Sequence, residues 1–269
     1  MGSLRAKQAS YIEVMKAISV GGLQGLTRHD RAMFDYIVES MHRYTAGSVD
    51  PNFEGYDADL KLYLPFDETS GATAHDLSGN GNTGTATGTT IVDGVFGKAR
   101  SFNGTSDDVQ VPYDASFGAT TVGTIEIWVY PTETNNFILG CYTDVEEYFR
   151  LSTEGGIFTF MQEVGNVVVT QIRGDSNIVY DKWHLLAVTQ NGTAAKLYID
   201  AVLQTTVGAN SGNWFNDNPA SILHFGNTLG WGGYWFAGKL DEPRIYSRVL
   251  SADEIYLHYL AGALKLGLI

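Results

Sequence analysis

Cysteine is almost absent from this chain: Cys141 is the only one among 269 residues. One thiol cannot form a disulfide within the chain or build a cysteine-based zinc cluster, so a bound metal ion would be held by oxygen atoms. Long apolar runs are also missing, because no stretch approaches the roughly 18 residues of a membrane span. The first residues lack the apolar region and cleavage site of a secretory signal. These absences predict a soluble protein with no membrane partner and no visible signal peptide.

Basic residues are scarce. The chain has 17 Lys and Arg against 30 Asp and Glu, which gives a formal net charge of −13. Binding to nucleic acid depends on clustered Lys and Arg that replace counterions on the phosphates, so nucleic acid is excluded as a partner. Hydrophobic residues make up 44% of the chain, which is enough for a folded core.

The N-terminal part differs from the rest of the chain. Residues 11–18 and 33–41 place apolar side chains at helical spacing, and a Gly-, Ser- and Pro-containing stretch follows them. We therefore predict a helical arm over 1–45, a linker over 46–59 and a large domain over 60–269. The arm is too short to bury its own apolar faces. It therefore packs on its own domain, docks into a partner assembly or forms homo-oligomers.

After residue 60 the sequence favours β structure. Short runs rich in β-branched and aromatic residues alternate with turns of Gly, Asn and Asp. Ten or more such strands without intervening helices predict a two-sheet antiparallel sandwich or jelly roll. One helix is expected at the end, where Ser251 and Glu254 form a capping box before an apolar run. The predicted strands are KLYLPF (61–66), DDVQVP (107–112), TIEIWVYP (124–131), FILGCY (137–142), YFRLST (148–153), IFTFMQ (157–162), NVVVTQIR (166–173), KWHLLAVTQ (182–190), AKLYID (195–200) and ILHFGN (222–227).

The loop DLSGNGNTG, residues 76–84, combines an Asp, two Asn and three Gly. Calcium prefers carboxylate, amide and backbone oxygens, and glycines let a backbone turn tightly around it. Together with five other segments, this loop resembles the signature blocks of the concanavalin A-like lectin and glucanase superfamily, laminin G-like branch, over about residues 58–260. The other segments are FDETSG (66–71), GKARSFNGTSDDVQVP (97–112), TIEIWVYP (124–131), KWHLLAVTQNGTAAKLYID (182–200) and FAGKLDEPRIYSRVLSADEI (236–255).

The resemblance implies a jelly roll of two curved antiparallel sheets, commonly with one structural calcium. Carried over by position, it assigns Asp76, Asn80 and Asn82 of the glycine loop, together with Asp241, as oxygen donors to that ion. The alternative is that Asp76 and Asn82 make only side-chain-to-backbone turn hydrogen bonds, without a metal.

Two positions depart from the family pattern. Asp200 is followed by Ala201 where the family usually has Asp-Gly, which disfavours a hairpin turn that needs positive φ. Pro243 stands where the family usually has a β-branched residue. Because proline has no N–H group, it should lie at a sheet edge or at an unpaired position of a strand.

Catalysis is not expected. Retaining glycoside hydrolases need two carboxylates about 5 Å apart, and the E-x-D-x-x-E string of laminarinase-like relatives does not occur. Glu126 is alone on its strand, while Glu146 and Glu147 would point to opposite faces of theirs. We interpret all three as solvated charges.

Carbohydrate binding is better supported by the sequence. Sugars stack on aromatic rings and bond to Asn, Asp and backbone groups. Trp214 and Trp231 lie among Gly and Asn residues, so we predict them as glycan-binding rings in loops, while the aromatic residues at 234–236 belong to the core or to a sheet face.

Together, these observations favour a non-catalytic adhesion or carbohydrate-binding domain that is displayed through its N-terminal helices. An extracellular role without a visible export signal fits a phage virion protein of the tail, fibre or capsid surface. The alternatives are a structural decoration domain that binds no glycan and, with less support, a glucanase-type glycoside hydrolase.

Overall fold

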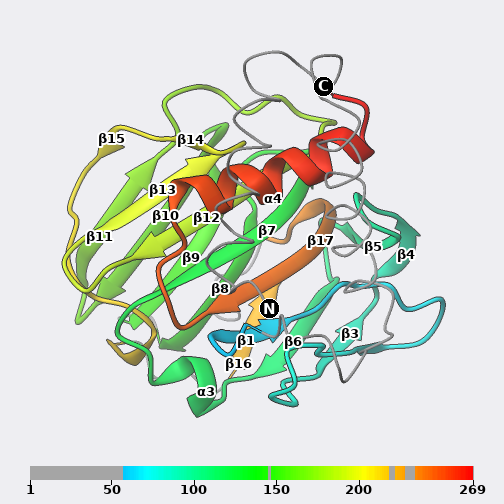
Figure 1. Cartoon of the computed structure of the whole chain (residues 1–269), viewed down its shortest axis with the longest axis horizontal. Helices are drawn as coiled ribbons and strands as arrows, with labels where there is room; N and C mark the ends of the chain where they lie inside the picture. The colour runs from blue at the N-terminus through cyan, green and yellow to red at the C-terminus, as the bar shows by residue number, and fades with distance from the viewer. Residues whose placement is uncertain (1–56, 145–146, 218–221, 228–233, 269) are drawn as a thin grey trace, which may run out of the picture.

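The computed structural model describes residues 57–144, 147–217, 222–227 and 234–268. These residues form two antiparallel sheets packed face to face (Figure 1). The predicted sandwich is therefore confirmed, and each of the ten predicted strands is present. The predicted arm over 1–45 and most of the predicted linker over 46–59 lie outside the described residues.

One sheet has eight strands in the order β14-β13-β12-β7-β17-β5-β4, with β1 also paired to β17. The side chains of strand β7 alternate between the two faces of this sheet. Ile125, Ile127 and Val129 belong to the core between the sheets, whereas Glu126 and Trp128 alternate with them on the outer face. The strands are β1 (Leu60–Tyr63), β4 (Thr90–Asp93), β5 (Lys98–Asn103), β7 (Gly123–Pro131), β12 (His184–Gln190), β13 (Ala195–Ile199), β14 (Val202–Leu203) and β17 (Ala237–Tyr246).

The other sheet has nine strands in the order β15-β11-β10-β9-β8-β16-β6-β3-β2. Its inner face completes the core with side chains such as Phe149, Phe158, Phe160 and Phe225. The strands are β2 (Thr73–Ala74), β3 (Gly84–Thr87), β6 (Asp108–Pro112), β8 (Phe137–Asp144), β9 (Glu147–Glu154), β10 (Ile157–Val164), β11 (Val167–Arg173), β15 (Thr206–Val207) and β16 (Ile222–Phe225).

The C-terminal helix α4 (Ala252–Lys265) lies across the outer face of the eight-stranded sheet (Figure 1). The predicted capping box is confirmed, because the Ser251 hydroxyl accepts from Glu254 N and the Glu254 carboxylate accepts from Ser251 N. Two shorter elements, α3 (Ala115–Gly118) and η2 (Phe215–Asp217), were not expected from the sequence. None of the helices in the described part of the chain is long and apolar enough to cross a membrane.

Both departures from the family pattern have a structural solution. Asp200 and Ala201 form the turn between β13 and β14 with φ angles of 51° and 63°, so the hairpin closes through two left-handed residues despite the missing glycine. Pro243 lies in a bulge of β17, where pairing to β7 shifts between Asp241 and Arg244. The bulge leaves Pro243 without a partner on β7, so its missing N–H group breaks no hydrogen bond there, as predicted, while its carbonyl oxygen accepts from Leu64 N at 3.0 Å.

His184 ties the start of β12 to two loops. Its Nδ1 lies 2.8 Å from Asp200 Oδ2, and its Nε2 lies 2.9 Å from the carbonyl oxygen of Val179. Burial lowers the pKa of His184, but the hydrogen bond and charge of Asp200 outweigh it, so this pKa is raised above its ordinary value. The imidazolium is therefore favoured in the folded chain.

This pair gives the protein a pH dependence. A histidine whose pKa is higher in the folded state contributes stability that is complete below its unfolded pKa of about 6.5 and is lost as the pH rises through the folded value. We expect the free energy of unfolding of the native protein to fall from pH 6 to pH 8 more steeply than that of His184→Gln. Urea denaturation across this range measures the difference, and parallel curves would contradict it.

Candidate functional site

The glycine loop is closed by hydrogen bonds to Asp76. Asp76 Oδ1 accepts from Tyr63 N and Ser78 N at 3.0 and 2.9 Å, and Oδ2 accepts from Ser78 Oγ and Asn82 N at 2.8 and 2.7 Å. Both oxygens are thus occupied by donors, and a cation placed on them would face N–H and O–H groups. This is the hydrogen-bonding pattern of the turn alternative.

The two asparagines fasten the same loop to β1. Asn80 Nδ2 donates to Leu60 O at 3.0 Å, and Asn82 Nδ2 donates to Lys61 O at 2.8 Å. The structure therefore brings together Asp76, Asn80 and Asn82, and gives them a role in positioning the first strand.

Asp241 binds a different loop. Its Oδ2 accepts from Val95 N and Phe96 N at 2.7 and 3.1 Å, while its Oδ1 is buried and has no hydrogen-bond partner among the described residues. A buried carboxylate oxygen without a donor is costly unless a proton or a cation satisfies it. Of the four predicted calcium donors, Asp241 is the one whose surroundings fit a hard cation.

Further charges surround Asp241. Burial and then the negative charge of Glu242 raise the pKa of Asp241 well above its ordinary value, and Asp67 adds to the shift. Glu242 accepts from Tyr63 Oη at 3.0 Å and pairs with Arg244, which lies in the same bulge. Within the described ranges, no group of three or more Asp, Glu, His or Cys side chains is arranged to hold a metal ion. A cation at Asp241 would thus need backbone oxygens or water as further ligands.

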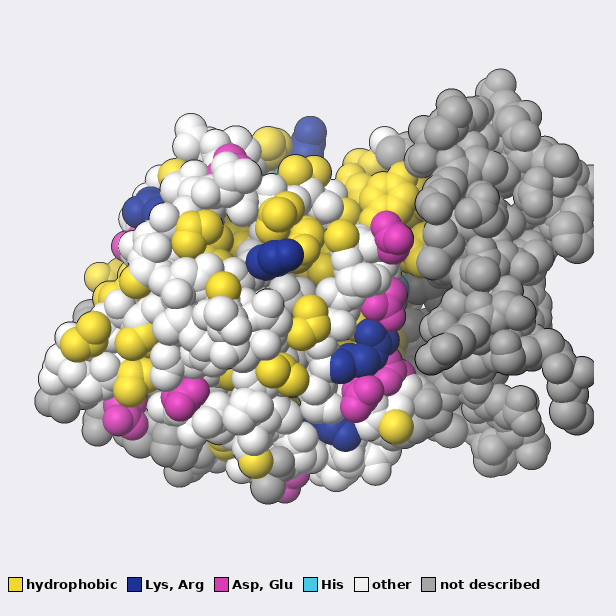
Figure 2. All heavy atoms as spheres, turned by 60° about the vertical axis from the view of Figure 1, so that its left-hand side comes forward, with side chains coloured by type: hydrophobic (Ala, Val, Ile, Leu, Met, Phe, Trp, Pro, Cys, Tyr) yellow, Lys and Arg dark blue, Asp and Glu magenta, His cyan; other side chains and the backbone are white. Residues whose placement is uncertain are grey.

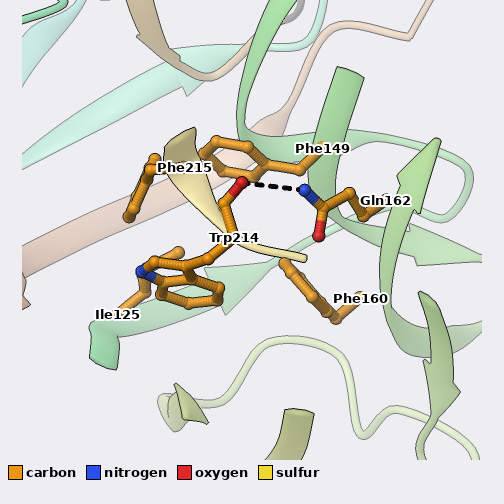
Figure 3. A pocket seen from close by; sticks show the side chains of 6 residues that line it. All are labelled: Ile125, Phe149, Phe160, Gln162, Trp214 and Phe215. Atoms are coloured by element: carbon orange, nitrogen blue, oxygen red, sulfur yellow. Dashed lines mark hydrogen bonds between the residues drawn. The ribbon is translucent and has the colours of Figure 1, made fainter. Parts of the chain in front are cut away.

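Trp214 does not lie open in a loop. It is 2% exposed and packs between the sheets against Phe160 and Phe215, with ring centroids 6.2 and 5.0 Å away (Figure 3). Its carbonyl oxygen accepts from Gln162 Nε2 at 3.0 Å, which fixes the segment in the core. The ring presents no face to a sugar, which corrects the prediction for Trp214. Trp231 lies outside the described residues.

An aromatic stack that was not predicted lies on the nine-stranded sheet. The Tyr234 ring stacks on Phe137 with centroids 4.9 Å apart and planes 19° apart. The Arg150 guanidinium lies 4.7 Å from the Phe137 ring and 5.8 Å from the Tyr148 ring. We call these four residues the Tyr234 stack. Phe137 is 3% exposed, whereas Tyr234 is 38% exposed and forms the accessible end.

Carboxylates border the Tyr234 stack. Arg150 Nη2 lies 3.2 Å from Glu154 Oε2, and Tyr148 Oη donates to Glu163 Oε2 at 3.0 Å. The strand register explains this arrangement, since Tyr148 pairs with Glu163 and Arg150 with Met161 across β9 and β10. An exposed ring beside hydrogen-bonding carboxylates and a guanidinium matches the chemistry of a sugar, which offers an apolar ring face and hydroxyl groups.

Helix α4 covers two residues of β7 on the outer face of the eight-stranded sheet. Glu126, interpreted from sequence as a solvated charge, is 1% exposed, and its Oε2 lies 2.7 Å from Nδ1 of His258 on α4. Trp128 beside it stacks on Tyr259 with centroids 6.0 Å apart. The helix covers both residues, which corrects the interpretation of Glu126.

The edge of the sandwich with β11, β14 and β15 carries exposed hydrophobic side chains. In Figure 2 they are scattered among polar atoms. Single exposed apolar residues are normal on a protein surface and do not indicate a binding patch. The residues are Val167, Val168, Val202, Leu203 and Val207.

Comparison with known proteins gives a family. A laminin G model, described as the concanavalin A-like lectin/glucanases superfamily, matches residues 103–256, which is more than half of the chain. None of the curated protein sequences matches this chain.

Several solved structures share the fold. Domain 4 of AbnA, a GH43 extracellular arabinanase from Geobacillus stearothermophilus solved in complex with arabinotriose, is 23% identical with a TM-score of 0.60, covering 74% of this chain and 97% of that one. The binding domain of Paraclostridial Mosquitocidal Protein 1 is 19% identical with a TM-score of 0.58, covering 76% and 52%. A structure from work on botulinum neurotoxin type C, a toxin whose cell entry depends on two ganglioside molecules, is 14% identical with a TM-score of 0.59. The match covers 76% of this chain and 51% of that one. The chain spans about half the length of these two toxin chains.

Proposed function

Because this chain belongs to the concanavalin A-like lectin/glucanases superfamily, we propose that its sandwich is a non-catalytic carbohydrate-binding domain that contacts a glycan through the Tyr234 stack. The observation that carries the proposal is the exposed end of this stack: the Tyr234 ring stacks on Phe137, and the Phe137 ring lies 4.7 Å from the Arg150 guanidinium. Support also comes from the similar structures, since one was solved with arabinotriose and another concerns ganglioside-dependent entry.

The sugar is bound in this proposal by two kinds of contact. Its apolar face stacks on the exposed Tyr234 ring, and its hydroxyl groups bond to the carboxylate of Glu154, which pairs with Arg150 at 3.2 Å. The side chain of Glu154 is 39% exposed and that of Arg150 is 15% exposed, so the carboxylate is the more accessible partner. The carboxylates of Glu154 and Glu163, which contact members of the stack, favour a neutral glycan over an acidic one, because like charges repel.

The test is a titration of the full-length protein with arabino-oligosaccharides and ganglioside oligosaccharides at millimolar concentration. We expect Tyr234→Ala to raise Kd at least about tenfold, equivalent to about 1.4 kcal/mol. Tyr256→Ala is the matched control, since it removes a tyrosine from α4 on the opposite sheet, and should leave Kd unchanged. Equal effects of the two substitutions would reject the Tyr234 stack, and no binding on a broad glycan panel would favour a purely structural domain.

The absence of catalysis belongs to the same proposal. Glu126 is held beneath α4 by His258, and a buried carboxylate in that position cannot reach a polysaccharide. A glycoside hydrolase would need two accessible carboxylates around the bond to be cleaved. Cleavage of a bound polysaccharide that Glu126→Gln abolishes without unfolding the protein would revive the hydrolase alternative.

Two further parts complete the proposal. Residues 1–45 attach the domain to a larger assembly, such as a virion, so that the sandwich acts at a virion surface or outside a cell. A structural calcium is held by Asp241, with Asp67 as a neighbouring carboxylate. When bound, the ion would neutralise the buried negative charge and fasten the 94–98 loop to β17.

A further inference from the structure

The turn between β9 and β10 carries no side chains at its centre. Its two central residues, Gly155 and Gly156, have φ angles of 61° and 77°, and the two strands pair directly on either side of them. Glycine adopts these angles without strain, which suits the tightest kind of hairpin turn. Gly155 N donates to Asn135 Oδ1 at 2.8 Å, and Gly156 N donates to Thr134 Oγ1 at 2.7 Å. The turn is therefore fixed in position while its surface stays free of Cβ atoms.

Two polar groups border this turn. Arg173 Nη2 lies 3.7 Å from the point where a Cβ atom on Gly155 would be, and Tyr180 Oη lies 3.5 Å from the same point on Gly156. Both side chains are half-buried, and neither polar group has a hydrogen bond or ion pair within the described part of the chain. A guanidinium offers several N–H donors and a phenol one O–H donor. We call Gly155, Gly156, Arg173 and Tyr180 the turn subsite.

Glu154 connects the turn subsite to the Tyr234 stack. It is the last residue of β9, directly before Gly155, and its Oε2 lies 3.2 Å from Arg150 Nη2. Leu151 belongs to the core, so the alternation along β9 turns both Arg150 and Glu154 to the outer face. The carboxylate that contacts the sugar in the proposed function is therefore next to the turn.

The strand register places Arg173 in line with Phe137. Arg173 points to the outer face, because Ile172 before it belongs to the core. Arg173 pairs with Thr159 across β11 and β10. Thr159 pairs in turn with Ser152, which pairs with Phe137. Neighbouring strands lie about 4.8 Å apart, so this row extends about 14 Å from β8 to β11, which is longer than a single sugar ring.

We propose that the turn subsite binds a second sugar unit, so that the domain recognises neutral oligosaccharides of at least two units rather than single sugars; this rests on the function proposed above. One unit stacks on Tyr234 and bonds to Glu154. The next unit lies on the turn, where the missing Cβ atoms leave room for it. Its hydroxyl oxygens accept from the Arg173 guanidinium and the Tyr180 hydroxyl, two groups that otherwise gain no hydrogen bond within the described chain.

Calorimetric titration of the full-length protein with two neutral pairs, arabinose with arabinobiose and galactose with lactose, tests this length preference. We expect the Kd of the better-bound disaccharide to be at least about tenfold below that of its monosaccharide. Arg173→Ala should remove most of this gain and leave the Kd of the monosaccharide unchanged, whereas Tyr234→Ala should weaken both. Tyr180→Phe keeps the ring that packs on the core, and should remove a smaller part of the gain.

Lys196→Ala is the matched control, because it removes one positive charge from β13 of the eight-stranded sheet and should change neither Kd. If Arg173→Ala does not fold, Arg173→Gln replaces it. Equal Kd values for monosaccharide and disaccharide, or a gain that survives loss of the Arg173 guanidinium, would overturn the turn subsite and leave sugar contact at Tyr234 intact. Failure of the native protein to bind any of the four sugars would instead count against the proposed function itself, and the turn subsite with it.

Discussion

Replacing Trp214 by alanine is expected to lower the free energy of unfolding by about 3–5 kcal/mol, the usual cost of removing a large aromatic residue from a core. The ring contacts Phe160 and Phe215 between the two sheets and is 2% exposed. Its removal leaves a cavity in the pocket drawn in Figure 3, which neighbouring side chains fill only partly.

Urea denaturation of the full-length protein measures this loss. Trp183→Ala serves as the matched control. Trp183 is half-buried against Tyr130 on the outer face of the eight-stranded sheet, so its removal should lower the free energy of unfolding less. A glycan affinity that falls in Trp214→Ala while stability stays unchanged would restore Trp214 as a binding residue.

The sandwich itself was predictable because its signals are local. Alternation along β7 separates Ile125 and Ile127 from Glu126, and this period alone identifies a strand. The capping box at Ser251 lies within one turn of the helix it starts. Such signals do not depend on how distant segments meet.

The candidate site was not predictable, because its residues come from segments that are distant in the sequence. The Tyr234 stack joins Phe137 of β8 and Arg150 of β9 to a residue just before β17, and only the register of the sheet brings them together. Trp214 follows Gly and Asn residues that predict an exposed loop, yet its ring packs in the core against Phe160 and Phe215. The burial of Glu126 likewise depends on α4, which lies 132 residues away from it at His258.

Calcium has the other large expected effect. If Asp241 holds the ion, calcium at about a hundredfold excess over Kd raises the free energy of unfolding by about 2.7 kcal/mol, and at a thousandfold excess by about 4.1 kcal/mol. Thermal unfolding in calcium and in chelator measures this difference. An unchanged Tm in both, with no metal found by elemental analysis, would reject the calcium site.

Two substitutions distinguish whether Asp241 or Asp76 binds the calcium ion. Asp241→Asn keeps an oxygen that can accept from Val95 N and Phe96 N but removes the charge at the unsatisfied Oδ1, so its Tm should no longer depend on calcium. Asp76→Asn weakens the hydrogen bonds from Ser78 and Asn82, so it should lower Tm equally in calcium and in chelator. The opposite result, a calcium response lost in Asp76→Asn and kept in Asp241→Asn, would assign the ion to the glycine loop. The comparison works because both carboxylates accept backbone hydrogen bonds, and only Asp241 has a buried oxygen without a donor.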